Sequence, residues 1–427
     1  MAKLGVIADD LTGASDTGVQ FSKLGLRTIV VWELSYTKKA AGTTDVLVVD
    51  TESRADDPEI AYMKAKEAAT SLLEVGVYPV FKKIDSTLRG NIGAELDGVC
   101  DAMGDPVVFV APAFPRNRRT TVKGYQLLDG VQLEHSFLKY DRLAPVGCSH
   151  IASIIRKQSR RLVKQIPLKL VSSGIASLQS RIRSWVKSGF RIFVLDAVTN
   201  AHLNTIAMAA SRFSSTVLLC GSAGLAEEIP YVINLIPEGG QVLVVAGSLS
   251  EVTKRQVTYI EKCLKTSRIT VNLDSIIRSK YSRVSEVERA VNLLRRELDT
   301  TSVGILTLEK SATHMTEKTH HPEHVETPSR HVILETLGHA AAEAMRPELS
   351  GIVVTGGDTA MAVVKAIGAY SIKLEDEVEA GVAAGTLSGG PWSGTRILTK
   401  AGAFGDDSTL LRALCYLRRR QTFRPRS

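Results

Sequence analysis

Cysteine is scarce in this sequence, and its placement excludes two common roles. The five cysteines are widely separated, odd in number and never in C-x-x-C spacing. A disulfide framework and a thiolate metal site both need closely patterned cysteines. We therefore expect most of these cysteines to be small buried hydrophobic side chains.

Long hydrophobic runs are absent as well. No run of about 18 or more apolar residues occurs, as a transmembrane helix would require. The N-terminus, MAKLGVIADD, has neither the longer apolar region nor the small-residue cleavage site of a secretory signal. We expect a cytoplasmic protein without a membrane partner.

Signatures of nucleic-acid binding are missing, despite a formal net charge of +8. The basic excess lies mainly in residues 156–187 and in the C-terminal tail, and aromatic residues are not interleaved with it. A surface that binds single strands would combine the two, and no zinc-finger or RRM pattern occurs. We expect solvated helix faces and no nucleic-acid partner, while the positive potential could attract anionic substrates.

A histidine-rich stretch is present, but it lacks the spacing of a metal site. It contains His314, His320, His321, His324 and His331. No H-E-x-x-H pattern occurs, and prolines within the stretch would break any helix that could align the histidines. We expect an exposed loop there, and no metal-ligating residues.

The chain of 427 residues is long enough for two domains. Short Val- and Ile-rich segments alternate with helical patterns, which favours an α/β protein with a largely parallel sheet. Two prolines and a Gly-Gly pair in residues 229–240 indicate a linker. We predict two α/β domains, 1–232 and 240–427, with largely parallel sheets and an active-site cleft between them.

Polar residues gather where three predicted strands of the first half end. Asp9 and Asp10 follow one strand, Arg54 follows another, and residues 81–91, FKKIDSTLRGN, include the end of a third. Strand ends of an open α/β sheet point into the crevice where ligands bind. Arginine offers a bidentate fork for a carboxylate, while acids and hydroxyls can bind substrate hydroxyls, so the cluster suits a carboxylated polyol. Helix capping and a solvated turn are the alternatives.

The second half contains glycine turns that follow predicted strands. Residues 353–360, VVTGGDTA, pass from a strand through Gly356 and Gly357 into a helix. Free N–H groups and the positive end of the helix dipole make such a turn an anion site, suited to nucleotide phosphates. Neither G-x-x-x-x-G-K-[ST] nor G-x-G-x-x-G occurs. The turns at Gly247-Ser248 and Gly402 would let the backbone approach the same ligand, and Asp358 could bind a ligand or cap the helix.

Taken together, these motifs resemble the signature blocks of the four-carbon acid sugar kinase family. The blocks ADDLTGASDTGVQF, VVDTESR, KKIDSTLRGNIGAEL, APAFPRNRRTTVKGYQL, GGDTA and TKAGAFGD occur in this order. The resemblance implies an N-terminal domain that holds a sugar acid and a C-terminal domain that holds ATP. The opening block is most similar to D-threonate kinases, so D-threonate, phosphorylated at its terminal hydroxyl, is the expected substrate. D-erythronate and the oxo-tetronates are the alternatives.

Residue chemistry and the resemblance together give two sets of candidate residues. The substrate-side candidates are Asp9, Asp10, Arg54, Lys82, Lys83, Asp85, Ser86, Thr87 and Arg89. The nucleotide-side candidates are Ser248, Gly356, Gly357, Asp358, Thr359 and Gly402. We hypothesise that Arg89 or Arg54 binds the substrate carboxylate, and that Mg²⁺ accompanies ATP. Asp358 is the first candidate for the catalytic base, with Asp9 and Asp85 next.

Two other classes of function are compatible with these residues. A dinucleotide-dependent oxidoreductase or a non-catalytic regulator would also bind two ligands, although the dinucleotide fingerprint is missing.

Many family members have Gly-Arg before Thr-Thr, where this chain has Asn117-Arg118-Arg119. Because Asn tolerates a left-handed backbone, we expect Asn117 to preserve a turn there. The oligomeric state is open, and a homodimer is one form it could take.

Overall fold

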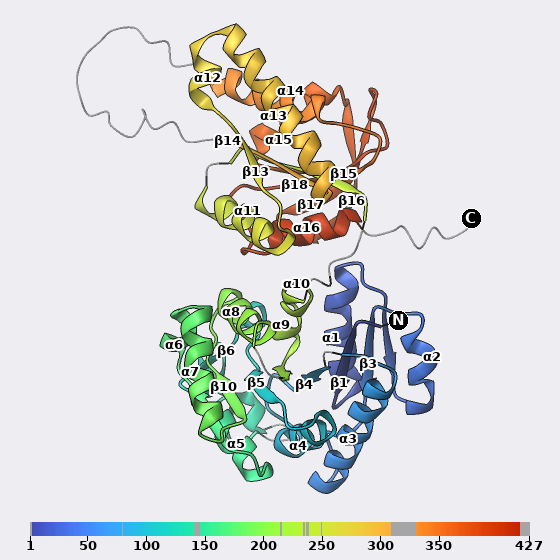
Figure 1. The fold of residues 1–427 in the computed structure, drawn as a ribbon, viewed down its shortest axis with the longest axis vertical. Coiled ribbons are helices and arrows are strands. Elements are labelled where there is room, and N and C mark those ends of the chain that lie inside the picture. The colour runs from blue at the N-terminus through green and yellow to red at the C-terminus, as the bar shows by residue number, and fades with distance from the viewer. Residues whose placement is uncertain are drawn as a thin grey trace, which may run out of the picture. The chain divides into compact units, whose positions relative to one another are not determined.

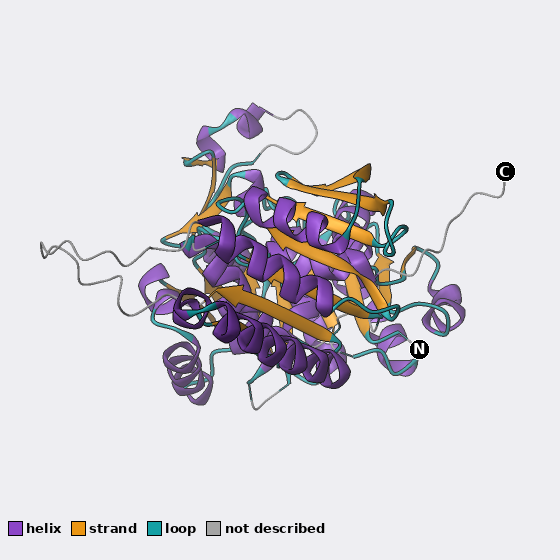
Figure 2. Cartoon of the chain, turned by 90° about the horizontal axis from the view of Figure 1, so that it is seen from above, coloured by secondary structure: helices purple, strands orange, loops and turns teal. Residues whose placement is uncertain are grey.

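The computed structural model of the protein describes residues 2–78, 80–140, 146–213, 216–233, 235, 239–248, 250–308 and 330–418. The chain divides into two compact units, Met1–Ile236 and Pro237–Ser427 (Figure 1). Each unit has its own large sheet, and helices flank the strands (Figure 2). Because most strand pairs in both sheets are parallel, the predicted α/β class is confirmed. The expected cleft between the domains stays a prediction.

The N-terminal unit is built on an eight-stranded parallel sheet in the order β2-β3-β1-β4-β11-β5-β10-β9. Its central strands are nearly continuous apolar runs, because helices cover both faces of a parallel sheet. Alternate side chains enter opposite cores: Leu47 and Val49 pack on one face, Val46 and Val48 on the other. The strands are β1 Leu4–Ala8, β2 Thr28–Val31, β3 Val46–Asp50, β4 Val80–Lys83, β5 Val107–Ala111, β9 Val163–Ile166, β10 Ile192–Leu195 and β11 Val217–Gly221.

Helices of this unit pack on both sheet faces. Ala65 and Leu96 bring α3 and α4 to the face that holds Leu47, whereas Phe21 and Leu203 bring α1 and α8 to the other. The helices are α1 Leu11–Lys23, α2 Thr37–Ala41, α3 Pro58–Glu74, α4 Ile92–Met103, α5 Ile151–Gln158, α6 Leu168–Ser172, α7 Ile175–Lys187, α8 Asn200–Ser211, α9 Ala223–Ala226 and α10 Ile229–Val232.

A small antiparallel sheet follows β5 and contains the departure from the family pattern. Its strands are β6 Arg119–Val122, β7 Tyr125–Leu128 and β8 Val131–Gln132. The residue with a left-handed backbone is Arg118, with φ of 55°, and Asn117 ends a short 3₁₀ turn before it. The expected turn is therefore present at Asn117, but the left-handed residue is Arg118. The strained position falls on a residue whose Cβ disfavours it.

The C-terminal unit contains a seven-stranded sheet in the order β13-β14-β12-β15-β18-β17-β16. It is parallel up to β18, and β17 pairs antiparallel with both of its neighbours. The strands are β12 Gln241–Ala246, β13 Arg268–Val271, β14 Val303–Leu308, β15 Leu349–Thr355, β16 Ser371–Glu379, β17 Val382–Ser388 and β18 Arg396–Lys400. The helices are α11 Glu251–Leu264, α12 Leu273–Arg278, α13 Lys280–Thr301, α14 Arg330–Glu343, α15 Gly357–Ile367 and α16 Thr409–Arg418.

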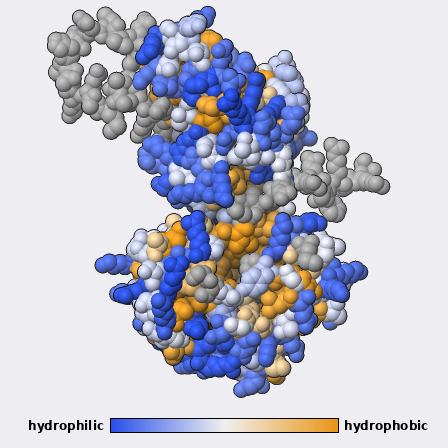
Figure 3. Space-filling model, viewed as in Figure 1, coloured by the Kyte–Doolittle hydropathy of each residue, from blue (hydrophilic) through white to orange (hydrophobic). Residues whose placement is uncertain are grey.

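The surface of each unit mixes polar and apolar residues. On the visible face of the C-terminal unit, hydrophilic residues in blue predominate and hydrophobic residues are scattered among them (Figure 3). Over the part of the chain that the structure describes, every helix is too short or too polar to span a bilayer.

Candidate active site

The ends of β3, β1 and β4 bring the predicted substrate residues together. β1 pairs with β3 on one side and with β4 on the other, all in parallel. The three carboxyl ends therefore meet at one edge of the sheet, where open α/β folds bind their ligands. Asp9 and Asp10 follow β1, Arg54 follows β3, and the turn 85–89 follows β4.

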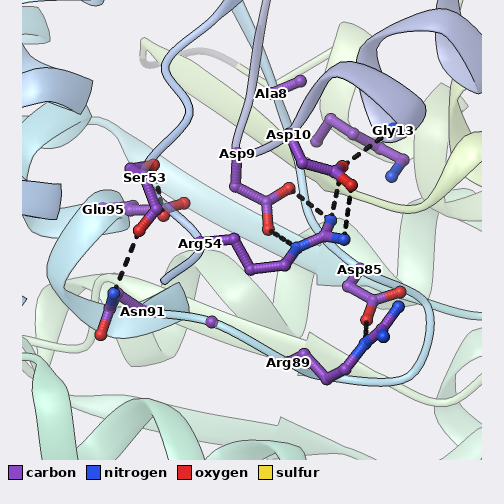
Figure 4. A network of polar contacts seen from close by, with 12 residues as sticks. Ala8, Asp9, Asp10, Gly13, Ser53, Arg54, Asp85, Arg89, Asn91 and Glu95 are labelled. Carbon is purple, nitrogen blue, oxygen red and sulfur yellow. Dashed lines mark hydrogen bonds and ion pairs between the residues drawn. The ribbon is translucent and has the colours of Figure 1, made fainter. Parts of the chain in front are cut away.

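Arg54 lies between Asp9 and Asp10 and forms ion pairs with both (Figure 4). Its Nε and Nη2 donate to the Oδ2 and Oδ1 of Asp9, at 2.7 and 3.0 Å. Its Nη1 and Nη2 donate to the Oδ2 and Oδ1 of Asp10, at 2.6 and 2.7 Å. Asp10 also caps α1 by accepting from the Gly13 N–H at 2.8 Å. Two bidentate pairs on one guanidinium fix both carboxylates in place.

The electrostatics of Arg54 are those of a permanent internal cation. Burial opposes its charge, but hydrogen bonds and ion pairs with Asp9, together with nearby Asp85 and Asp10, outweigh burial and raise its pKa. Four of the five N–H donors of an arginine are already used here. Arg54 therefore has little capacity left for the substrate carboxylate, which we expected either Arg54 or Arg89 to bind.

The turn after β4 orders Asp85 and leaves part of Arg89 available. Asp85 accepts hydrogen bonds from the Thr87 N–H and hydroxyl, and from Arg89 Nε. Burial opposes ionisation of Asp85, but the bonds from Arg89 and Thr87 outweigh it and lower its pKa. Within the described residues, Arg89 Nη1 and Nη2 donate to no protein group, and its side chain is 31% exposed. That end of the guanidinium can bind a carboxylate.

Lys83 is a second cation available to a ligand at this edge. The residue is only 4% exposed, and its ammonium donates no hydrogen bond to any described group. Burial lowers its pKa, although Asp9 and Asp85 act in the opposite direction. The Nζ lies beside Gly13, where a Cβ would be 2.7 Å away. A buried ammonium without a hydrogen-bond acceptor is costly, so the site is suited to an anionic or hydroxylated ligand.

Lys82 differs from the expectation that it contacts substrate. It alternates with Lys83 along β4 and points into the opposite face of the sheet. Its ammonium pairs with Glu95 Oε2 at 2.6 Å, and the two side chains are 0% and 1% exposed. Ser53 Oγ donates to the other oxygen of Glu95 at 2.8 Å. The Lys82 side chain has no exposed surface in this structure, and its ammonium also donates to the Lys83 carbonyl at 2.8 Å, so a supporting role fits it better than a substrate contact.

Two further substrate-side candidates and several supporting residues complete this edge. The Thr87 hydroxyl is engaged with Asp85, whereas Ser86 is partly exposed and its carbonyl accepts from Gln126 at 2.9 Å. Gly90 has φ of 93°, and a Cβ there would lie 3.4 Å from Asp9 Oδ2. Sequence analysis did not single out the supporting residues Gly13, Ser53, Gly90, Glu95 and Gln126. Only Gly90 carries a signal in the sequence, because it falls inside a polar turn, whereas Gly13 lies in the first turn of α1.

Glycine turns after three neighbouring strands form a second candidate region, in the C-terminal unit. β12 pairs with β15, and β15 with β18, so the turns that follow them lie close together. A Cβ at Gly402 would lie 2.7 Å from Ser248 Oγ, and one at Gly247 would lie 2.3 Å from Thr359 Oγ1. Gly356 has φ of 96°, and α15 begins directly after it. Only glycine permits these close approaches.

A cavity of about 510 Å³ adjoins these turns. One side is formed by Gly247, Ser248 and the first turn of α15, which includes Asp358 and Thr359. The other side is apolar, with Leu273, Leu308, Ile333 and Leu334. The first N–H groups of a helix have no partner within the helix and favour anions. The cavity thus offers an anion-binding end and an apolar end within one unit.

Most of the histidine-rich stretch lies outside the described residues. This applies to His314, His320, His321 and His324. His331 is described, and its Nε2 lies 3.0 Å from Glu335 Oε1 on α14. Across the described ranges, no group of three or more His, Cys, Asp or Glu side chains is arranged to hold a metal ion.

Two family models match the chain, one in each unit. One is described as a sugar-binding N-terminal domain and matches residues 4–229. The other is described as a nucleotide-binding C-terminal domain and matches residues 243–410. The substrate-side candidates lie within the first match and the nucleotide-side candidates within the second.

Curated relatives match over nearly the full length. A D-threonate kinase of Salmonella typhimurium is 37% identical, covering 97% of this chain and 98% of that protein. A D-erythronate kinase of Heliobacterium modesticaldum is 32% identical, covering 98% and 97%. A crystal structure from Bordetella bronchiseptica, described as a domain of unknown function with bound citrate in a domain-swapped dimer, is 28% identical with a TM-score of 0.64. It covers 99% of this chain and 100% of that chain.

Proposed function

The chain belongs to the four-carbon acid sugar kinase family, and on that premise we propose that it transfers the γ-phosphoryl group of ATP to D-threonate. The expected acceptor is the terminal C4 hydroxyl. The relatives support a sugar-acid kinase over a dinucleotide-dependent oxidoreductase or a non-catalytic regulator. D-Erythronate and 3-oxo-tetronate are the alternative substrates, because relatives with those names match over similar lengths.

One observation supports the substrate proposal: two cations, Arg89 and Lys83, lie at the same strand edge as a fixed set of carboxylates and have N–H donors that bind no acceptor among the described residues. Arg89 offers its Nη1–Nη2 end to the substrate carboxylate, and the Lys83 ammonium donates to a carboxylate or hydroxyl oxygen. Asp9 and Asp10, held by Arg54, accept hydrogen bonds from the hydroxyls. Of the two arginines expected to bind the substrate carboxylate, Arg54 and Arg89, we therefore propose Arg89.

On the nucleotide side, we propose that the cavity beside the glycine turns holds ATP. Its apolar end suits the base, and the N–H groups of the turns and of α15 suit the phosphates. Mg²⁺ is usually bound by one or two carboxylates plus phosphate oxygens, and it neutralises phosphate charge when bound. Asp358 lines the cavity, so its carboxylate could bind Mg²⁺ together with the phosphate oxygens of ATP. Further protein ligands are not required.

Asp358 also stays the first candidate for the catalytic base. It lines the cavity proposed for ATP, beside the transferring phosphoryl group. The bonds from Arg89 and Thr87 lower the pKa of Asp85, which weakens that carboxylate as a base. Asp358→Asn separates the possibilities. Near-normal turnover with normal ATP affinity would exclude the base role.

The proposal is tested by ADP release with a panel of four-carbon acids: D-threonate, L-threonate, D-erythronate and the oxo-tetronates. We expect the highest kcat/KM with D-threonate. Loss of the Arg89 bonds to a carboxylate removes about 2–3 kcal/mol, so Arg89→Met should raise KM for the acid by about 30- to 150-fold. KM for ATP should stay unchanged.

The matched control is Arg27→Met, because Arg27 is an exposed arginine whose partner is Asp45, away from the strand edge. This variant should behave as the wild type. Equal KM values for the acid in Arg89→Met and Arg27→Met would contradict the proposal that Arg89 binds the substrate carboxylate. A higher kcat/KM for another four-carbon acid would identify that acid as the substrate instead.

Location and assembly follow as secondary proposals. A kinase that uses ATP works where ATP is plentiful, so we propose the cytoplasm. The Bordetella structure is described as a dimer, and we propose a homodimer for this chain, which sedimentation velocity tests directly.

A further inference from the structure

Lys400 ends β18 and is buried directly before the turn that carries Gly402. Only 2% of the residue is exposed. Its ammonium donates to the carbonyl oxygens of Ala401 at 2.7 Å, Phe404 at 2.9 Å and Gly402 at 3.5 Å. All three acceptors belong to one short turn. Lys400 makes no ion pair among the described residues, which is unusual for a buried lysine.

The same carbonyl groups are bound from the α11 side. Ser250 Oγ and Thr253 Oγ1 donate to the Gly402 carbonyl at 2.8 and 2.9 Å. Gln256 Nε2 donates to the Phe404 carbonyl at 3.0 Å. In a trans peptide the C=O and the next N–H point in opposite directions. Because the carbonyls of Ala401 and Gly402 turn toward Lys400, the N–H groups of Gly402 and Ala403 turn away from it.

Gly402 lies against the other glycine turns of this unit. Its Cα region approaches Ser248 and Gly356, both of which line the candidate nucleotide cavity. N–H groups that point away from Lys400 at this position are available to a phosphate. The Lys400 ammonium lies on the opposite side of the 401–404 turn and binds its carbonyl oxygens.

The acceptors of this charge among the described residues are all backbone carbonyl oxygens. Thr355 is the strand neighbour of Lys400, but its buried Oγ1 does not accept a hydrogen bond from the ammonium. Carbonyl oxygens in such a cluster are the ligands that bind K⁺ in proteins. Burial lowers the pKa of Lys400, with Glu379 acting in the opposite direction, as expected for a charge without a close acid.

We propose that Lys400 is a positioning residue that serves as a tethered monovalent cation for the nucleotide site. Its ammonium occupies the oxygen cluster, holds the 401–404 turn and makes an exchangeable K⁺ or NH₄⁺ ion unnecessary. The inference rests on the proposed nucleotide site and adds a cation to it. Lys400 should therefore affect the binding of ATP and not the binding of the sugar acid.

The first test uses the wild-type enzyme. Its ADP-release rate is measured with Na⁺ or tetramethylammonium as the only monovalent cation, and then with added KCl or NH₄Cl at constant ionic strength. We expect no dependence on the added ion. Strong activation by K⁺ or NH₄⁺ would overturn the inference without any variant.

The second test uses Lys400→Ala, with Lys262→Ala as the matched control because Lys262 is an exposed lysine on α11. Loss of hydrogen bonds from a charged group should raise KM for ATP by about 10- to 100-fold. KM for the acid should stay unchanged, and NH₄⁺ should restore part of the ATP affinity. An unchanged KM for ATP, or a loss that no cation restores, would overturn the inference.

Binding of a fluorescent ATP analogue separates this inference from the proposed function. A wild type that releases no ADP with any acid contradicts the kinase proposal. The response of analogue binding to Lys400→Ala and to NH₄⁺ then still decides the role of Lys400.

Discussion

Replacing Arg54 with methionine is expected to destabilise the N-terminal unit by about 3 kcal/mol, the low end for breaking a buried ion pair. Arg54 donates four hydrogen bonds to Asp9 and Asp10, and the Asp9 side chain is only 3% exposed. Without Arg54, the Asp9 carboxylate is buried without its main counter-ion. The estimate stays at the low end because the Arg54 and Asp10 side chains are 20% and 26% exposed, so water can solvate part of the site.

The loss of stability is measured by urea or thermal unfolding. A loss of about 3 kcal/mol lowers Tm by about 6–12 °C for a unit of this size. Activity should be lost as well, because the carboxylates that accept the substrate hydroxyls are no longer held. The triple variant with Arg54→Met, Asp9→Asn and Asp10→Asn removes the uncompensated charges. It should recover most of the stability and none of the activity.

Arg89→Met is the comparison variant, because Arg89 contributes one bond to Asp85 and is more exposed. We expect its stability to lie within about 1 kcal/mol of the wild type, as for partly exposed ion pairs. Wild-type stability in Arg54→Met would refute the assignment of Arg54 as an internal counter-ion. So would a triple variant as unstable as Arg54→Met alone.

Three further predictions concern single positions. Gly13→Ala places a Cβ 2.6 Å from Asp10 Oδ1 and 2.7 Å from Lys83 Nζ. The resulting strain of about 1–3 kcal/mol should lower kcat/KM by about 5- to 150-fold. Gly42→Ala, whose Cβ meets no atom closer than 3.6 Å, is the control. Arg118→Gly removes a left-handed non-glycine residue and should stabilise the protein by about 1 kcal/mol, and a lower Tm would contradict this. Burial lowers the pKa of Lys400 from 10.5 to about 8, against the effect of Glu379, which pairs with Arg412. Between pH 8 and 10.5, Lys400 keeps its proton in the unfolded chain and has released it in the folded chain. The free energy of unfolding should therefore rise with pH in this range, and this gain is lost as the pH falls through 8. Lys400→Met should abolish that rise in urea unfolding.

Much of the fold could be predicted because its strands have the pattern of a buried parallel sheet. Residues 46–49 and 107–111 are apolar throughout, and the structure gives strands at 46–50 and 107–111. The order of the strands could not be read from the sequence, since β11 inserts between β4 and β5 although it follows them by many residues. Sequence period indicates which residues are buried, and it carries no information on which strands become neighbours.

The sequence indicated which residues gather at the candidate site, but not which of their side chains pair with one another. The motif around Asp9, Arg54 and Asp85 indicated that these side chains meet at strand ends. It could not show that Arg54 is bound by both acids, because three-dimensional distance decides which opposite charges pair. The adjacent lysines are a similar case: Lys82 and Lys83 look equivalent in sequence, and the strand places them on opposite faces.

The most direct test of the central claim is ³¹P NMR of a reaction that contains the enzyme, Mg²⁺, ATP and D-threonate. The account predicts that ATP signals are replaced by those of ADP and by a new phosphomonoester signal split by two protons, because a C4 phosphate is attached to a CH₂ group. Arg89→Met should form the same product more slowly at low acid concentration. Release of inorganic phosphate alone, or unchanged ATP with every four-carbon acid, would contradict the account.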